Sequence, residues 1–253
     1  MADINNKEVI KQCIEAFAGL EMRNYIQTIR SASGASFTYY VPRPEALIRV
    51  LEIGREAVPY LTELLRRSNE EIRMAALRSL WEITSKHYGF EDVTDFSCTA
   101  IVTARWPDII ESWQRWWDAN KGRSEFEWLS EQIKNGSPSD KYSAVRRFGE
   151  LGDKRAIPLL VEAISDPDIG GNRFNHQDLY AALARLGDGH AVPYLIDVLL
   201  TNDMESYRSE GLRFLKYITG ETMGYDPEAS VETRDESIKK WREWWEQNKD
   251  KYL

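Results

Sequence analysis

One segment of this chain occurs twice, and that repetition constrains the fold more than any other feature of the sequence. EAVPYLTEL at 56–64 returns as HAVPYLIDV at 190–198, and a shorter copy, RAIPLLVEAI, occupies 155–164. Each long copy is followed by a tryptophan-rich segment, IIESWQRWWDANK at 109–121 and SIKKWREWWEQNK at 237–249. Repetition of this kind is typical of stacked supersecondary units, each of which contacts only its neighbours. The sequence therefore predicts an array of helix pairs rather than one compact catalytic fold.

Apolar residues recur at helical spacing through most of the chain, and turn sequences such as Gly-Asp and Asp-Pro-Asp separate the segments. This periodicity predicts an all-α protein. The predicted helices are 5–18, 22–32, 70–84, 107–121, 138–151, 155–165, 174–186, 190–201, 204–219 and 234–249. Only 99–104 has a weak strand pattern.

Two helix starts carry the signature of a capping box, in which a hydroxyl residue and an acid three positions later accept each other's backbone N–H groups. Ser137 and Asp140 form the first, with Pro138 at the first helical position. Thr233 and Glu236 form the second, before the last helix. We expect both hydroxyl residues to be N-caps.

The two long copies differ in length within one segment. Their Ile-Thr pairs, 83–84 and 218–219, are 135 residues apart, whereas Trp113 and Trp241 are 128 apart. The first copy therefore carries seven extra residues, and 85–105 is the longest irregular stretch of the sequence. A long loop in a tight array predicts either an insertion or a functional segment.

Composition excludes several classes of function. The 253 residues include 33 basic and 41 acidic side chains, a formal charge of −8, and a field of this sign repels nucleic acids. Cys13 and Cys98 are too few for a disulfide framework or a cysteine-based metal site. The N-terminus lacks a signal-peptide core, and no run approaches the roughly eighteen apolar residues of a membrane span. We therefore expect a cytoplasmic protein that binds no membrane, and the negative charge counts against general binding of nucleic acid.

Two segments share an ordered set of motifs, FGELGDKRAIPLLVEAISDPD at 148–168 and LARLGDGHAVPYLIDVL at 183–199. In each, a Leu-Gly-Asp turn ends one helix and Ala-Ile-Pro or Ala-Val-Pro opens the next. With these motifs the chain resembles HEAT repeats, in particular the PBS-lyase HEAT-like subclass, over roughly 46–86 and 138–219. The tail at 218–249, with its W-x-x-W-W motif, resembles one found in some bacterial HEAT-repeat proteins.

The resemblance implies an α-α superhelix, a HEAT-like solenoid of about five to six helix pairs. We expect three parts: an N-terminal helical cap at 1–45, a HEAT-like unit with the loop insertion and a tryptophan-rich helix at 46–123, and HEAT-like repeats with a tryptophan-rich capping helix at 124–253. Aligned basic residues are expected to pair with acids of neighbouring turns. The basic residues are Arg73, Lys141 and Arg208, and the acids include Asp166, Asp168 and Asp203.

Aromatic stripes at helical spacing usually form core, so the tryptophan-rich helices are expected to close the end of a helix stack. The alternative is that Trp116 or Trp244 stays partly exposed and anchors a partner. The three histidines, His87, His176 and His190, lack ligand partners at helical spacing, so no metal site is expected. Because neither a nucleophile elbow nor a phosphate loop occurs, we predict no catalytic residue and no cofactor.

In stacked helix pairs the second helix of each pair lines the concave side, and its non-core positions are the candidate protein-binding residues. They are Arg78, Arg146, Arg147, Gln177, Tyr180, Arg185, Arg213 and Tyr217. The alternative is a set of solvated helix faces. Because arginine offers forked donors to carboxylates, the predicted partner is another protein or a peptide segment, acidic in character.

The leading hypothesis is a non-enzymatic scaffold or adaptor that binds a protein on its concave face. The resemblance keeps open a bilin lyase-like or chaperone-like accessory factor and a DNA-binding HEAT-like glycosylase, although the negative charge counts against the last of these. A regulatory or inhibitory factor of immunity type, specific for one protein, is a further alternative. The sequence predicts no oligomeric state.

Overall fold

The computed structural model of this chain consists of helices joined by short turns. It describes residues 2–18, 45–86, 88, 106–169 and 173–253, and no strand occurs in these ranges. The predicted all-α class is confirmed. The predicted helix 22–32 lies outside the described residues, and so do the weak strand pattern at 99–104 and most of the 85–105 loop.

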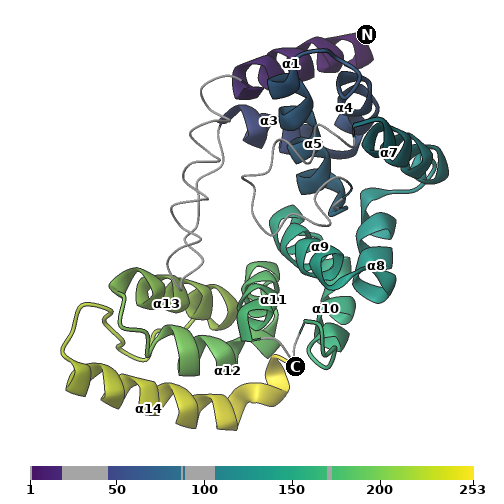
Figure 1. Cartoon of the computed structure of the whole chain (residues 1–253). Helices are drawn as coiled ribbons and strands as arrows, with labels where there is room; N and C mark the ends of the chain where they lie inside the picture. Colours follow the sequence, from purple (N-terminus) through teal and green to yellow (C-terminus); the bar gives the residue numbers. More distant parts are fainter. Residues whose placement is uncertain (1, 19–44, 87, 89–105, 170–172) are drawn as a thin grey trace. The chain divides into compact units, whose positions relative to one another are not determined.

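The chain divides into two compact units, Met1–Leu129 and Ser130–Leu253, here called unit 1 and unit 2. Each unit contains one of the two long repeats. The sequence places a boundary at 123/124, whereas the division between the units falls inside helix α8 (Glu125–Asn135). Figure 1 labels the helices of both units along the chain.

Unit 1 is built around one helix pair, α4 and α5. Its helices are α1 (Ala2–Ala16), α3 (Glu45–Ile53), α4 (Val58–Leu64), α5 (Glu70–Thr84) and α7 (Trp106–Asn120), followed by the first part of α8. Helices α1 and α3 pack on each other and on α5, and α7 packs on α4 (Figure 1). Phe17, Trp113 and Trp128 are among the largest fully buried side chains of its core.

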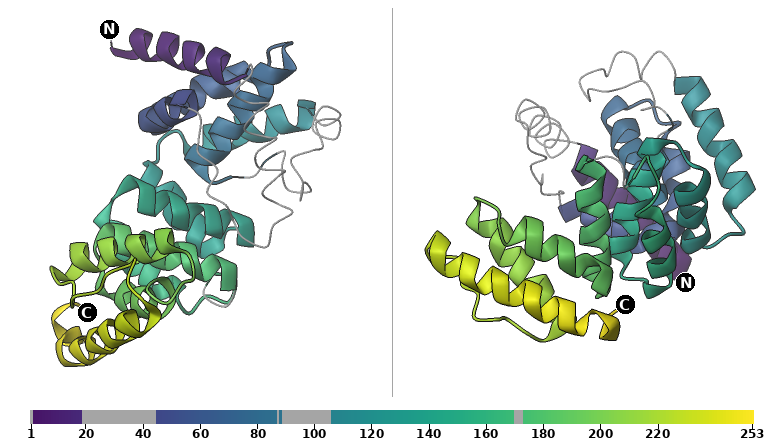
Figure 2. Two further views of the ribbon diagram at one scale, coloured as in Figure 1. Left: turned by 90° about the vertical axis from the view of Figure 1, so that its left-hand side faces the viewer. Right: turned by 90° about the horizontal axis from the view of Figure 1, so that it is seen from below.

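Unit 2 is built of successive helix pairs. Its helices are α9 (Pro138–Leu151), α10 (Ile157–Ala163), α11 (Arg173–Leu186), α12 (Val192–Tyr194) with its π-helical continuation η5 (Leu195–Leu199), α13 (Glu205–Thr219) and α14 (Val231–Asn248). Helix α11 packs on α9, α10 and α13, so the second helices α9, α11 and α13 form one layer. Helix α14 packs on α12 and η5 and lies at the edge of the unit (Figure 2). In both units the tryptophan-rich helix therefore packs on the first helix of a pair.

The Leu-Gly-Asp turns have a local physical explanation. Gly152 ends α9 with a φ of +67°, a left-handed conformation that glycine adopts without steric cost. Asp153 then accepts a hydrogen bond at 3.1 Å from the backbone N–H of Arg155, which starts the short 3₁₀ turn into α10. The same arrangement recurs at Gly187 and Asp188 before α12. The motif thus ends one helix and begins the next within a few residues.

The two long repeats share side-chain hydrogen bonds as well as sequence. Thr84 and Thr219 donate to the carbonyl oxygen four residues earlier, at 2.8 and 2.7 Å, and accept from the backbone N–H two residues later. Asn120 and Asn248 each donate from Nδ2 to the carbonyl oxygen four residues earlier, at 2.8 Å. The helix ends of the two repeats therefore have the same local structure.

One further aromatic ring covers the tryptophan-rich helix in each unit, but it comes from different places in the two repeats. In unit 1, Trp128 of α8 packs on the second and third tryptophans of the W-x-x-W-W motif, with ring centroids 5.0 and 6.1 Å away. In unit 2, Tyr252 follows α14 and packs on the corresponding pair at 5.7 and 6.1 Å. Aromatic packing of this kind adds to the burial of both helices.

The residue that precedes each EAVPYL-type segment also differs between the repeats. Gly189 lies so close to Tyr252 that a Cβ atom at this glycine would be 2.4 Å from the tyrosine carbonyl oxygen. In unit 1 this position is Arg55, whose guanidinium lies 5.8 Å from the Trp128 ring and donates to the carbonyl oxygen of Arg123 at 2.8 Å. Gly189 thus leaves room for Tyr252 in unit 2, whereas Arg55 contacts the Trp128 ring in unit 1.

The capping box at Ser137 is confirmed, because Asp140 N–H donates to its hydroxyl at 3.2 Å and its own N–H donates to the Asp140 carboxylate at 3.3 Å. The second predicted cap is wrong. Helix α14 begins at Val231, and the N-cap is Ser230, whose hydroxyl accepts from the N–H of Thr233. Ser230 has the extended backbone that an N-cap requires, with ψ at 158°, so Thr233 lies within the first turn.

Helix α8 is a helix that the sequence analysis missed. Its start has a capping box of its own, with Ser124 N–H donating to the Glu127 carboxylate at 2.7 Å and Glu127 N–H donating to the Ser124 hydroxyl at 3.3 Å. The Ser-x-x-Glu signal is present in the sequence and would have located this helix.

Candidate protein-binding surface

Seven of the predicted binding residues lie on α9, α11 and α13, the second-helix layer of unit 2, and are here called the inner face. They are Arg146, Arg147, Gln177, Tyr180, Arg185, Arg213 and Tyr217. These three helices carry eight Lys and Arg against five Asp and Glu, whereas the rest of unit 2 carries nine against seventeen. The layer is therefore locally basic within an acidic unit.

On α9, two neighbouring arginines share one carboxylate. Arg146 Nε and Arg147 Nη1 both lie 3.8 Å from oxygens of Glu150. The Arg147 side chain is only 7% exposed and belongs to the packing of the unit, whereas the Arg146 side chain is 31% exposed. Of the two, only Arg146 presents much surface to a partner.

On α11, Gln177 and Arg185 are exposed, in agreement with a role on the surface. Tyr180 is half-buried, because its ring stacks on Tyr194 of α12 with centroids 4.9 Å apart and planes 8° from parallel. Tyr180 therefore joins the two helix layers and offers little area to a partner.

Asp178 of α11 interacts with two tyrosines, Tyr142 and Tyr194. Asp178 accepts a hydrogen bond from the Tyr142 hydroxyl at 2.7 Å. Burial, together with the negative charge of Asp178 and the neighbouring Tyr207, raises the pKa of Tyr194 to about 12. Tyr194 thus stays neutral at physiological pH and acts as a packing group.

On α13, Arg213 and Tyr217 are both exposed. Tyr217 is 60% exposed, and the Arg213 side chain is 66% exposed. Arg213 lies 3.5 Å from Glu210 and 4.3 Å over the Phe214 ring. These two residues, one turn apart, form an open part of the candidate surface.

Three predicted residues lie apart from the inner face. Arg78 of unit 1 is 6% exposed and pairs with Glu82. Trp116 is 8% exposed, which corrects the alternative that it stays open as an anchor. Trp244 is half-buried, with its ring 5.7 Å from both Trp241 and Tyr252.

The predicted register contact of Lys141 is confirmed. Its ammonium group lies 2.8 Å from Asp166 and 2.9 Å from Asp168, and these hydrogen bonds raise the pKa of Lys141. Burial alone would raise the pKa of Asp166, but the bond from Lys141 and a backbone N–H outweigh it and hold that pKa below its ordinary value. The contact joins α9 to the turn after α10.

The other two aligned basic residues use different partners. Arg208 donates to the carbonyl oxygens of Asn202, Asp203 and Pro227 at 2.7 to 2.9 Å, not to the Asp203 carboxylate as the sequence predicted. Arg73 lies 4.7 Å over the Trp106 ring. Lys141, Arg208 and Arg73 occupy aligned positions of the repeats. Their partners differ: two carboxylates for Lys141, three backbone carbonyl oxygens for Arg208 and an aromatic ring for Arg73.

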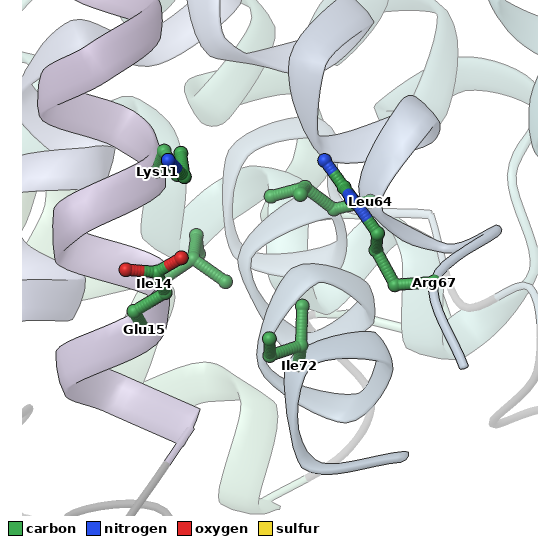
Figure 3. A pocket seen from close by; sticks show the side chains of 6 residues that line it. All are labelled: Lys11, Ile14, Glu15, Leu64, Arg67 and Ile72. Carbon is green, nitrogen blue, oxygen red and sulfur yellow. The ribbon is translucent and has the colours of Figure 1, made fainter. Parts of the chain in front are cut away.

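Unit 1 contains a small depression between α1 and the α4–α5 pair (Figure 3). Its volume is about 100 Å³, close to that of a single side chain. Ile14, Leu64 and Ile72 supply apolar surface, and Lys11, Glu15 and Arg67 supply charge. None of the predicted binding residues lines it.

Two features of the described ranges concern metal ions and membranes. No group of three or more His, Cys, Asp or Glu residues is placed there to hold a metal ion. His190 bonds through Nδ1 to the Asp188 carboxylate at 2.8 Å. Among the described helices, none combines the length and apolar character needed to cross a bilayer.

Comparison with known protein families agrees with the geometry of unit 2. The PBS lyase HEAT-like repeat model matches residues 140–166, which span most of α9, the Leu-Gly-Asp turn and α10. Residues 140–166 are therefore a HEAT-like repeat, and the helix pairs of the described residues form a helical repeat scaffold. A comparison with curated proteins finds no match.

Proposed function

We propose that this protein is a non-enzymatic scaffold that binds another protein, through an acidic segment of that partner, on the inner face of unit 2. The observation that carries the proposal is the charge distribution of unit 2, with a basic second-helix layer in an otherwise acidic unit. The accessible positive charges of this layer, on Arg146, Arg185 and Arg213, steer acidic partners and disfavour basic ones.

The accessible residues of the layer suit this role. Arg146, Arg185 and Arg213 come from three successive helices, so a bound segment would contact several repeats at once. Arginine forms forked hydrogen bonds with carboxylates, and together with tyrosine it dominates the binding energy of many protein interfaces.

The test compares two charge-reversal variants in affinity capture from the source cells, with quantitative mass spectrometry. We expect Arg146→Glu plus Arg185→Glu to reduce capture of the specific partner by about tenfold or more. Lys239→Glu plus Lys240→Glu, at exposed positions on α14, is the matched control and is expected to leave capture unchanged. Equal capture by all three proteins would exclude the inner face as the binding surface.

A further inference from the structure

Helices α5 and α13 are equivalent members of the two long repeats, and two of their positions differ in a way that bears on binding. Arg78 and Glu82 of α5 correspond to Arg213 and Tyr217 of α13, 135 residues later. On α5, Arg78 pairs with Glu82 one turn further along, and the two side chains are 8% and 1% exposed. The Arg78 guanidinium lies 3.7 Å over the Trp81 ring. In unit 1 the carboxylate that pairs with Arg78 therefore comes from Glu82 of the same helix.

On α13 the same face lacks that carboxylate and is open. Tyr217 stands where the glutamate stands on α5, and no acidic residue occurs from 211 to 219. Arg213 pairs with the carboxylate of Glu210 at 3.5 Å, on the side toward the helix start. The last two turns of α13 therefore present the positive charges of Arg213 and Lys216 beside an exposed aromatic ring.

One edge of the Tyr217 ring contacts a neighbouring helix end, although most of the residue is exposed. It lies against the backbone of Gly187 at the end of α11, where a Cβ atom would be 3.2 Å from Cε1 of the ring. A tyrosine side chain has only two χ angles, so it loses little conformational entropy when a partner covers it. Tyr217 is thus suited to anchor a partner.

We infer that the end of α13 is a docking site for an acidic segment of another protein, which supplies the carboxylate that Glu82 supplies on α5. That carboxylate pairs with the guanidinium of Arg213, and an apolar side chain next to it in the partner covers the ring of Tyr217. The inference rests on the proposed function and narrows it to one helix end and one partner chemistry.

The probe is a displayed library of short random peptides, selected on the immobilised full-length protein. We expect the selected peptides to contain Asp or Glu beside an aliphatic or aromatic residue. In a fluorescence anisotropy titration of one such peptide, Tyr217→Ala and Arg213→Glu should each weaken binding by about tenfold or more. Lys240→Glu on α14 is the control and should leave the dissociation constant unchanged.

A third variant tests the comparison between the repeats directly. Tyr217→Glu recreates on α13 the arginine–glutamate spacing of α5, so Arg213 gains a carboxylate on its own helix. This variant is expected to fold as the parent does, because position 217 is exposed, and to lose peptide binding. Retained binding by the Tyr217→Glu protein would overturn the inference.

The remaining outcomes separate the inference from the proposed function. If Arg146→Glu plus Arg185→Glu abolishes capture of the cellular partner while the Tyr217 and Arg213 variants capture it normally, the inner face binds but the α13 site is refuted. If no variant affects capture, both ideas fail. Selection of basic peptides, or sedimentation showing that Tyr217 mediates association of two copies of this chain, would also overturn the inference.

Discussion

At the scale of single residues, Trp113 and Trp241 occupy equivalent positions in the two repeats but differ in the hydrogen bonding of the indole N–H. Both side chains are 0% exposed. The indole N–H of Trp113 donates to the carbonyl oxygen of Tyr88 at 3.3 Å, whereas that of Trp241 is buried with no partner among the described residues. A buried donor without an acceptor costs about 1–3 kcal/mol.

Replacing each indole by a phenyl ring therefore gives a matched pair of variants. We expect Trp113→Phe to lower the free energy of unfolding by about 1–2 kcal/mol more than Trp241→Phe, because only the former breaks a hydrogen bond. Urea denaturation of the full chain, followed by far-ultraviolet circular dichroism, measures both. Equal losses, or a larger loss for Trp241→Phe, would contradict the assignment of the two N–H groups.

Residue identity alone did not decide which inner-face side chains are accessible. Arg146 and Arg147 are adjacent and chemically identical, yet their side chains are 31% and 7% exposed. Tyr180 and Tyr217 are both aromatic residues of second helices, but one stacks between helices and the other is open. The exposed fraction of each side chain depends on which residues of the neighbouring helix pack against it. Helical spacing in the sequence does not predict those contacts.

At the scale of secondary-structure elements, the contact between Lys141 and the Asp166–Asp168 turn connects α9 to the turn after α10, and its contribution depends on pH. The pKa of Asp166 is lowered from 3.8, so its stabilising effect is present above that value and is lost as the pH falls through the lowered pKa. The pKa of Lys141 is raised from 10.5, so its effect is present below that value and is lost as the pH rises through the raised pKa.

We expect Lys141→Met to lower the free energy of unfolding by about 1–2 kcal/mol near neutral pH. The difference from the parent should shrink as the pH falls below about 4, because the carboxylates then lose their charge. Urea denaturation across this pH range measures the effect, and Lys154→Met, at an exposed position, serves as the control. A difference that is constant with pH would refute the ion pair as its cause.

Helix boundaries were predictable where the chain carries a complete local signal. The box at Ser137 set the start of α9 because both of its hydrogen bonds are local. Ser124 and Glu127 form the same kind of capping box at the start of α8, a helix that was not among those predicted. At α14 there are two candidate hydroxyls, and Ser230 is the cap because its backbone is non-helical, with ψ at 158°.

At the scale of whole units, the charge pattern of unit 2 leads to a prediction about ionic strength. If the basic layer attracts an acidic partner, the association rate should fall as salt rises, since the screening length is about 10 Å at 0.1 M. Surface plasmon resonance with the captured partner measures the slope. The Arg146→Glu plus Arg185→Glu protein should show a shallower slope, and a rate independent of salt in the parent would contradict electrostatic steering.

The helical class, the repeat and the turns follow from the amino-acid sequence, because they depend on residue spacing, on glycine at a positive φ and on caps formed within a few residues. Tertiary structure alone decided that Trp128 and Tyr252, from non-equivalent positions, cover the two tryptophan-rich helices. It also decided that Arg78 is buried with Glu82 while Arg213 is open beside Tyr217. Burial and side-chain partners depend on the surfaces that neighbouring helices bring together in space, and a one-dimensional pattern does not contain those surfaces.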